Sequence, residues 1–226
     1  MIEHVRVIGA GRVGSAVSAR LEARGLRLVA DGEPLRDDAL VLLCVPDRAI
    51  AEVAGALEPG PWVAHVSGAT PLAALDPHAR RFSLHPLQTF TRARGPEQLD
   101  GAWATLTAET QEAAAVGFWL AETLGLRGFP LADEARPLYH AGAAMAANYL
   151  VALRRAAGRL FEEAGAPPEA LDPLMARTIE NGFELTGPIA RGDWDTVERH
   201  REAIRAAAPE LEAMYDALAE VTATCV

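Results

Sequence analysis

The sequence predicts an α/β protein in which a doubly wound, Rossmann-like parallel sheet is followed by a smaller all-α domain. Two observations predict this class. Across residues 1–131, short apolar segments that predict strands alternate with segments of helical period, which is typical of βαβ units. Across residues 132–226 only helical patterns occur. We therefore expect two domains with these bounds.

The first βα unit is expected over residues 4–24, where an apolar strand runs into Gly9, Gly11 and Gly14, a G-x-G-x-x-G pattern. Gly9 would allow a sharp turn, Gly11 would let a pyrophosphate approach the backbone, and Gly14 would let the helix pack closely on the sheet. The helix N-terminus would offer unpaired N–H groups to phosphates. The pattern predicts a dinucleotide site, and the alternative is an ordinary glycine-rich βα turn.

Further residues of this site are expected where the first strands end, because ligands bind beyond the carboxyl ends of parallel strands. Asp31 lies twenty-two residues past Gly9, where an acidic residue would reach an adenosine ribose. The predicted cofactor-binding set is Gly9, Gly11, Arg12, Val13, Gly14, Asp31, Val45, Pro46 and Ser67. Asp31 favours NAD over NADP.

The remaining elements follow from apolar pattern and turn residues. Further strands are expected at 26–30, 39–45, 62–66, 81–84, 102–106 and 127–130, with helices at 50–57, 71–75 and 110–124. A long helix is expected over 134–165, a second up to Gly182, a third opened by a capping box of Asp195 and Glu198, and a fourth from Pro209.

The composition narrows the function. A formal net charge of −10 argues against a partner with a phosphate backbone, so we expect no nucleic acid. The sequence contains no lysine, and all 21 basic residues are arginine, which excludes a Schiff-base or P-loop lysine. No apolar run is long enough for a membrane span, and the first strand begins too early for a signal peptide. We expect a cytoplasmic protein.

Three sets of residues are candidates for chemistry. His85 follows a strand at the predicted ligand edge and could transfer a proton near neutral pH, or it could bond only to loop backbone. His140 and Asn148 lie on one face of the long helix, whose small residues otherwise suit close packing. Thr186 and Arg191 could hold an anionic substrate group, although Arg191 could instead pair with Asp193 or cap a helix.

The other chemistry-bearing residues form no site pattern. His4, His65, His78 and His200 are expected to be structural or on the surface. Cys44 and Cys225 have neither metal-ligand spacing nor an obvious disulfide partner. We expect no metal.

Several motifs together resemble an uncharacterised family that pairs a Rossmann-like NAD(P)-binding domain with a helical domain of unknown function. The motifs are the glycine turn at 9–14, Ser83 to Phe90, Leu138-Tyr139-His140 with Asn148-Tyr149-Leu150, and Leu185 to Asp193. The layout is similar to pyrroline-5-carboxylate reductase, prephenate dehydrogenase and the 6-phosphogluconate and β-hydroxyacid dehydrogenases. The resemblance implies an NADP-linked oxidoreductase and a homodimer formed through a helical domain like the C-terminal domain of 6-phosphogluconate dehydrogenases.

Two features depart from these enzymes. β-Hydroxyacid dehydrogenases carry a lysine four residues before an asparagine on the long helix, and here Ala144 precedes Asn148 at that spacing. The segment that would read a 2′-phosphate is short and acidic, with Arg36 as its one basic residue. The resemblance favours NADP whereas Asp31 favours NAD, so the choice between the two cofactors stays open.

The sequence thus predicts an NAD(P)-dependent oxidoreductase that transfers hydride between nicotinamide and a small carbonyl or imine substrate in an interdomain cleft. His85 or His140 would supply the proton, Asn148 would orient the substrate, and Thr186 and Arg191 would bind it. The alternative is a sensor or assembly protein that binds NAD(P) without catalysis.

Overall fold

The computed structural model describes residues 2–226, which form two compact units divided between Ala144 and Met145. The first unit contains the sheet and the start of the long helix. Contacts therefore divide the chain inside that helix, whereas the change of sequence pattern placed the boundary after residue 131.

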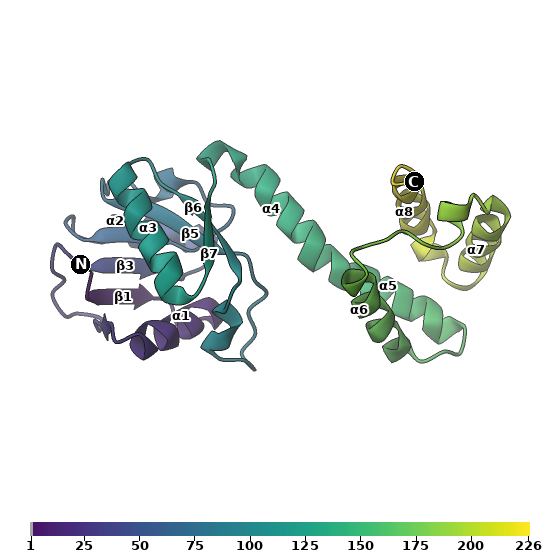
Figure 1. Ribbon diagram of the computed structural model, residues 1–226, viewed down its shortest axis with the longest axis horizontal. Coiled ribbons are helices and arrows are strands. Elements are labelled where there is room, and N and C mark those ends of the chain that lie inside the picture. Colours follow the sequence, from purple (N-terminus) through teal and green to yellow (C-terminus); the bar gives the residue numbers. More distant parts are fainter. Residues whose placement is uncertain (1) are drawn as a thin grey trace. The chain divides into compact units, whose positions relative to one another are not determined.

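The first unit is built on a seven-stranded sheet in the order β2-β1-β3-β4-β5-β6-β7 (Figure 1). The strands are β1 His4–Ile8, β2 Arg27–Leu28, β3 Leu40–Leu43, β4 Trp62–His65, β5 Arg81–Pro86, β6 Trp103–Thr107 and β7 Arg127–Pro130. Every neighbouring pair is parallel except β5 with β6. The predicted α/β class is confirmed, with a sheet that is mostly parallel.

The β5–β6 pair departs from a fully parallel sheet because the chain between these strands contains no crossover helix. Residues 87–102 hold only a short 3₁₀ turn, η3 (Pro96–Leu99), which packs on α1 (Arg12–Ala23). Without a helix to carry the chain to the far edge of the sheet, the next strand begins where the previous one ended and runs antiparallel to it.

Helices cover both faces of the sheet. On one face α1 and α3 (Gln111–Leu124) pack on a large apolar core, in which Leu21 and Leu120 are fully buried. On the other face α2 (Ile50–Gly55) and η2 (Leu72–Leu75) cover a smaller core around Val41. All four residues of β3 are buried, as expected for a strand covered on both sides.

The predicted long helix forms, but it is not a uniform α-helix. After η4 (Asp133–Ala135), α4 (Arg136–Ala144) is followed without a break by a π-helical turn over Met145–Tyr149 and then by α5 (Leu150–Glu163). A π turn inserts an extra residue and is frequent at functional sites. The change between the two compact units falls at its first residue.

The second unit contains three further α-helices after α5, which match the three predicted helices, and a 3₁₀ turn precedes each of them. They are α6 (Leu171–Glu180) after η6 (Pro168–Ala170), and α7 (Trp194–Ala207) and α8 (Glu212–Ala223) after η7 (Ile189–Arg191) and η8 (Pro209–Leu211). The expected capping box is wrong, because Asp193 rather than Asp195 caps α7. The Asp193 carboxylate accepts from the N–H of Thr196 at 3.1 Å.

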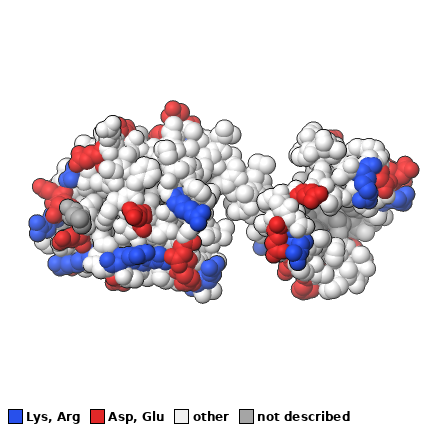
Figure 2. All heavy atoms as spheres, in the orientation of Figure 1, with Lys and Arg blue, Asp and Glu red and all other residues white. Residues whose placement is uncertain are grey.

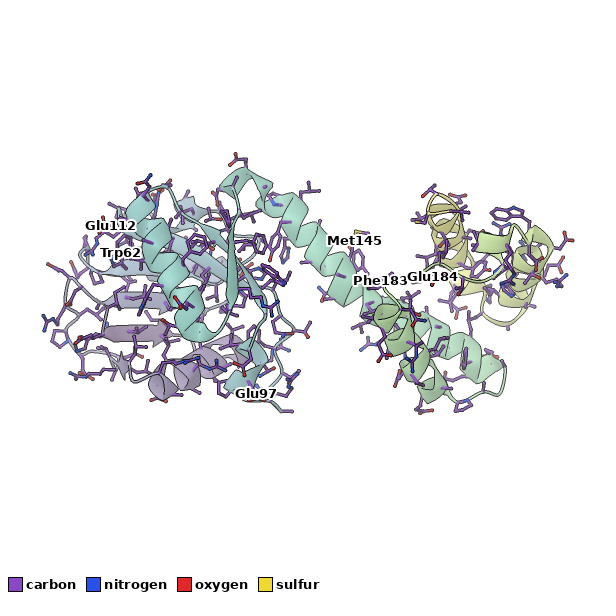
Figure 3. The ribbon with its side chains drawn as sticks, in the orientation of Figure 1. Trp62, Glu97, Glu112, Met145, Phe183 and Glu184 are labelled. Carbon is purple, nitrogen blue, oxygen red and sulfur yellow. The ribbon has the colours of Figure 1, made fainter. Side chains whose placement is uncertain are left out.

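The second unit buries few apolar side chains. Its buried apolar residues are Leu171, Val197, Ile204, Ala208 and Ala219. Large apolar side chains such as Met145 and Phe183, both labelled in Figure 3, are exposed instead. The face of the molecule seen in Figure 2 shows acidic and basic side chains interspersed, with uncharged areas between them. None of the helices within residues 2–226 is both long and apolar enough to cross a membrane.

Candidate functional site

The three glycines of the first βα turn have three different surroundings. Gly9 has φ +113°, and a Cβ there would lie 2.4 Å from the carbonyl oxygen of Cys44. At Gly14 a Cβ would lie 1.8 Å from the carbonyl oxygen of Gly9. At Gly11 a Cβ would meet nothing within 4 Å. Gly9 and Gly14 are therefore required by the fold, whereas Gly11 borders open space in which a ligand could approach the backbone.

The amino end of α1 lies directly behind this open space. Gly11 is the N-cap residue, and its carbonyl accepts from the N–H of Ser15 at 2.9 Å. No side chain caps the helix, so the N–H groups of its first turn are left for solvent or a ligand. Arg12 is exposed and Val13 is half-buried at this end. Unpaired N–H groups and the positive end of the helix dipole suit an anion.

The other predicted cofactor residues follow β2, β3 and β4. Asp31 is exposed in the loop after β2, and Val45 and Pro46 follow β3. Ser67 follows β4 and is buried, and its hydroxyl accepts from the N–H groups of Ala69 and Thr70 at 3.2 and 3.0 Å. The Ser67 hydroxyl therefore stabilises its own turn. We use "carboxyl edge" below for the edge at which β1, β3, β4 and β5 end.

His85 lies in β5 at the carboxyl edge and is bonded to α4. Its Nδ1 lies 2.9 Å from the hydroxyl of Tyr139, and the two rings meet edge to face with centroids 5.7 Å apart. The imidazole also lies directly over Gly68, where a Cβ would be 2.8 Å from Cε1. The alternative that His85 bonds only to loop backbone is therefore wrong, because its partner is the Tyr139 side chain.

His140 comes next to Tyr139 on α4 and also approaches His85. The centroids of the two imidazole rings are 6.5 Å apart, and His140 is exposed. The structure thus brings together the two histidines that the sequence singled out. Arg136, Tyr139 and His140 are spaced as i, i+3 and i+4, so that they lie along one face of α4.

Arg136 anchors this helix to the sheet. Its guanidinium is buried, donates to the carbonyl of Ser67 at 3.0 Å through Nη1, and pairs with Asp133 at 2.7 Å through Nε. Asp133 in turn accepts from the N–H of Leu72 at 3.0 Å. The second terminal nitrogen of Arg136, Nη2, is buried and has no partner among the described residues. A buried arginine with a carboxylate partner holds the start of α4 over β4.

The electrostatic surroundings keep His85 uncharged. Burial, together with the nearby His140 and Arg136, lowers the pKa of His85 to about 4, against the opposing effect of Asp47. At neutral pH the imidazole is therefore neutral. Burial and then Arg136 also lower the pKa of His65 to about 4, and the Nε2 atom of this buried side chain has no partner in the described structure.

Neither a reactive thiol at Cys44 nor a metal cluster is present in the part of the chain that the structure describes. Burial raises the pKa of Cys44 to about 12, so its thiol is not a thiolate near neutral pH. Among residues 2–226 no group of three or more His, Cys, Asp or Glu side chains is placed to hold a metal ion.

The remaining predicted residues lie in the second unit. Asn148 is exposed in the π turn, Thr186 is exposed after α6, and Arg191 is exposed at the end of η7. Arg191 forms no ion pair within residues 2–226, and the Asp193 carboxylate caps α7. Their roles in substrate orientation and binding stay predictions.

Sequence reasoning gave no role to Tyr139, Arg136 or Gly68. The first two share a helix face with His140, and this i, i+3, i+4 spacing is the signal that could have selected them. Nothing in the sequence indicates that Gly68 lies under the imidazole of His85, because that contact joins the segment after β4 to β5.

Taken together, a glycine-rich βα turn on a mostly parallel sheet, followed by a helical region, defines a Rossmann-like NAD(P)-binding oxidoreductase fold. The chain belongs to the family that shares a domain of unknown function, DUF2520, whose model matches residues 102–222. That range begins at β6 and includes Tyr139 and His140, whereas the glycine turn and His85 precede it.

Two solved structures match nearly the whole chain. The "putative NADP oxidoreductase BF3122" of Bacteroides fragilis is 22% identical with a TM-score of 0.80, and covers 99% of this chain and 98% of its own. Protein TM1727 of Thermotoga maritima is 24% identical with a TM-score of 0.77, and the match covers 98% of both chains. No curated protein matches the chain.

More distant matches include enzymes of known reaction. A reductive aminase of Aspergillus terreus, solved with NADPH and ethyl levulinate, is 16% identical with a TM-score of 0.67, over 98% of this chain and 93% of its own. Pyrroline-5-carboxylate reductase of Streptococcus pyogenes and prephenate dehydrogenase of Aquifex aeolicus match with TM-scores of 0.62 and 0.55. The resemblance in layout drawn from the sequence is confirmed at the level of the fold.

Proposed function

We propose that the protein is an NAD(P)-dependent oxidoreductase that transfers hydride between nicotinamide and a small carbonyl or imine compound at the carboxyl edge of the sheet. The observation that carries the proposal is the open space at Gly11 between two glycines that the fold itself requires. A structural turn would not need a third glycine that contacts nothing.

The residues of this turn fit a dinucleotide. Gly11 and the N–H groups at the start of α1 would hold the pyrophosphate, and Asp31 after β2 would bond to the adenosine ribose. When bound, nicotinamide supplies or takes up a hydride. Solved relatives with this fold include one bound to NADPH. The preference of this chain for NAD or NADP would be decided by comparing its affinities for NADH and NADPH.

The proton that accompanies hydride would come from the histidine pair. His85 cannot act as the acid at neutral pH, because burial lowers its pKa to about 4 and the imidazolium form is scarcely populated. We therefore assign proton transfer to His140, which is exposed and lies beside His85, and leave His85 as a hydrogen-bonding group. The convergence of two histidines at the carboxyl edge supports an enzyme over a sensor or assembly protein.

The test is a fluorescence titration of the protein with NADH and with NADPH. We expect saturable binding by the wild type and its loss in Gly11→Leu, because a large side chain there would occupy the space at the backbone. The matched control is Gly55→Leu, since a Cβ at Gly55 in α2 also meets nothing within 4 Å. Absence of binding with both dinucleotides, or equal binding by Gly11→Leu, would overturn the proposal.

We also propose that the protein is a homodimer formed through its helical unit. Large exposed apolar side chains concentrate after residue 137, and they are Leu138, Met145, Tyr149, Leu150, Val151, Leu153, Leu174, Ile179, Phe183, Leu185, Trp194, Leu218, Val221 and Val226. Residues 2–137 contribute only Leu87, Trp103 and Phe118 to this class. An apolar surface of this extent supports an interface with a second copy.

A further inference from the structure

Tyr139 takes no part in the proposed function, yet within residues 2–226 it makes the one protein hydrogen bond to the imidazole of His85. The hydroxyl lies 2.9 Å from Nδ1, and the Tyr139 ring is held between His85 and Phe129 by edge-to-face contacts, with centroids 5.7 and 6.4 Å away. Burial raises the pKa of Tyr139, against the opposing effects of Thr105 and Arg136, so that the phenol stays protonated. The hydroxyl is therefore available as a donor at a fixed position.

The direction of this hydrogen bond decides which nitrogen of His85 carries the proton. A neutral imidazole has one N–H and one bare nitrogen, and the partner of one nitrogen selects the tautomer. A phenol O–H is far more acidic than a neutral imidazole N–H, and a bare imidazole nitrogen is a better acceptor than a phenol oxygen. The stable arrangement has Tyr139 donating to Nδ1, which leaves the proton on Nε2.

The Nε2 atom is free to face a ligand. Within residues 2–226 no protein group hydrogen-bonds to it, and it is not among the fully buried polar atoms. The ring is half-buried over Gly68 at the carboxyl edge, where a Cβ would be 2.9 Å from Nε2. The absence of a side chain at Gly68 lets the imidazole lie flat against the backbone in one orientation.

We propose that Tyr139 is a positioning residue that holds His85 in the Nε2–H tautomer, so that His85 donates a hydrogen bond to the carbonyl oxygen or imine nitrogen of the substrate. This proposal rests on the proposed function. A neutral imidazole that donates a hydrogen bond stabilises negative charge as it develops on the substrate atom, without itself losing its proton.

The test is nitrogen-15 NMR of the histidine rings in the free protein, with the His85 signals assigned from a His85→Gln variant. We expect the wild type to show a protonated Nε2 and a bare Nδ1 at His85. In Tyr139→Phe, which keeps the ring and removes the hydroxyl, we expect a mixture of tautomers. We also expect a higher pKa of His85, since a donor to Nδ1 favours the neutral ring while His140, Arg136 and Asp47 stay unchanged.

The chain provides a matched control in its second unit. The Tyr215 hydroxyl lies 2.9 Å from Nδ1 of His200, with ring centroids 6.1 Å apart at 83°. Tyr215→Phe should change the signals of His200 and leave those of His85 unaltered. Gly68→Ala serves as a second variant. Its methyl group would push the imidazole away and so break the hydrogen bond from Tyr139, although the Tyr139 side chain itself is unchanged.

The outcomes separate this proposal from the proposed function. A proton on Nδ1 of His85 in the wild type, or an unchanged tautomer in Tyr139→Phe, would overturn the role of Tyr139. Addition of NADPH should shift the His85 Nε2 signal and not that of His200, and binding without such a shift would show that Nε2 faces elsewhere. A complete lack of dinucleotide binding would overturn the proposed function. The tautomer of His85 in the free protein would still decide whether Tyr139 positions its ring.

Discussion

Gly11 and Gly14 lie three positions apart in the chain, but the space around their Cα atoms is very different. A methyl group at Gly14 would meet backbone that cannot move aside, whereas one at Gly11 would meet solvent. We expect Gly14→Ala to lower the free energy of unfolding by about 3 kcal/mol or more, and Gly11→Ala to change it by less than about 0.5 kcal/mol. Urea unfolding of both variants measures this, and equal losses would contradict the contacts described.

His65 couples stability to pH. Its pKa is about 4 in the folded protein against an ordinary value of 6.5, so between these values the unfolded chain binds more protons than the folded one. The free energy of unfolding should therefore fall as pH is lowered from about 6.5 to 4, with a contribution from this group of up to about 1.4 kcal/mol per pH unit.

The measurement is urea unfolding across this pH range for the wild type and His65→Asn. The amide oxygen of asparagine can replace Nδ1 as the acceptor for the N–H of Ser67, a bond of 3.2 Å here. The variant should show a shallower decline, while His200→Asn at an exposed position should retain the wild-type decline. An unchanged slope in His65→Asn would mean that His65 titrates alike in both states.

At the residue scale, the sequence indicated which residues belong to the candidate site but not which residues contact one another there. The glycine turn and His85 could be selected because their positions at strand ends follow from local pattern. The contact of His85 with Tyr139 joins positions 54 residues apart, so local pattern could not supply it. Gly68 contacts the His85 ring, and this contact could be recognised only once the pairing of β4 with β5 was known.

At the scale of elements, α4 depends on the pair of Arg136 with Asp133. The Arg136 side chain is 1% exposed whereas that of Asp133 is 34% exposed. Asp133→Ala would leave a buried charge without its partner, and we expect it to destabilise the protein by about 3–5 kcal/mol. Arg136→Met should cost less, because Asp133 can be hydrated and keeps its bond from Leu72. Denaturant unfolding of the two variants gives the order, and the reverse order would contradict this account.

The positions of the elements were predictable, and their finer geometry was not. Each predicted strand forms, because a short apolar run between turn residues favours extended structure locally. The direction of β6 depends on a connection that lacks a helix, and the π turn at Met145–Tyr149 interrupts a helical pattern that reads as continuous. The N-cap of α7 shifted because Asp193 and Asp195 are both plausible caps by residue type.

At the scale of the whole molecule, the exposed apolar side chains of the helical unit predict self-association. We expect wild-type protein to have twice the mass of one 24.0 kDa chain by light scattering. The double variant Val151→Glu, Ile179→Glu introduces charge at positions 52% and 53% exposed, and should yield monomers that remain folded.

The control is Leu87→Glu, which changes an apolar residue of the sheet-containing unit that is 40% exposed. This variant should keep the mass of the wild type. A monomeric wild type, or dissociation caused by Leu87→Glu as well, would contradict a dimer through the helical unit.

The fold class followed from the sequence because periodicity and glycine placement are local properties that sum over many residues. The assembly of the site did not, because it depends on how a helix after the last strand meets strands far earlier in the chain. His85 and His140 were selected for separate reasons, and only the structure puts them side by side.

The reversed β6 has a consequence for where α4 can go. Since β7 is parallel to β6, the chain runs along β7 away from the carboxyl edge. The strand is short, and its last residue, Pro130, pairs with Leu106 and so lies level with Leu84, next to His85. The chain therefore leaves β7 near the level at which β4 ends, and α4 begins close to the carboxyl edge. There Arg136 bonds to the carbonyl of Ser67 and Tyr139 bonds to His85. The short, reversed last strands thus deliver the next helix to the histidine pair.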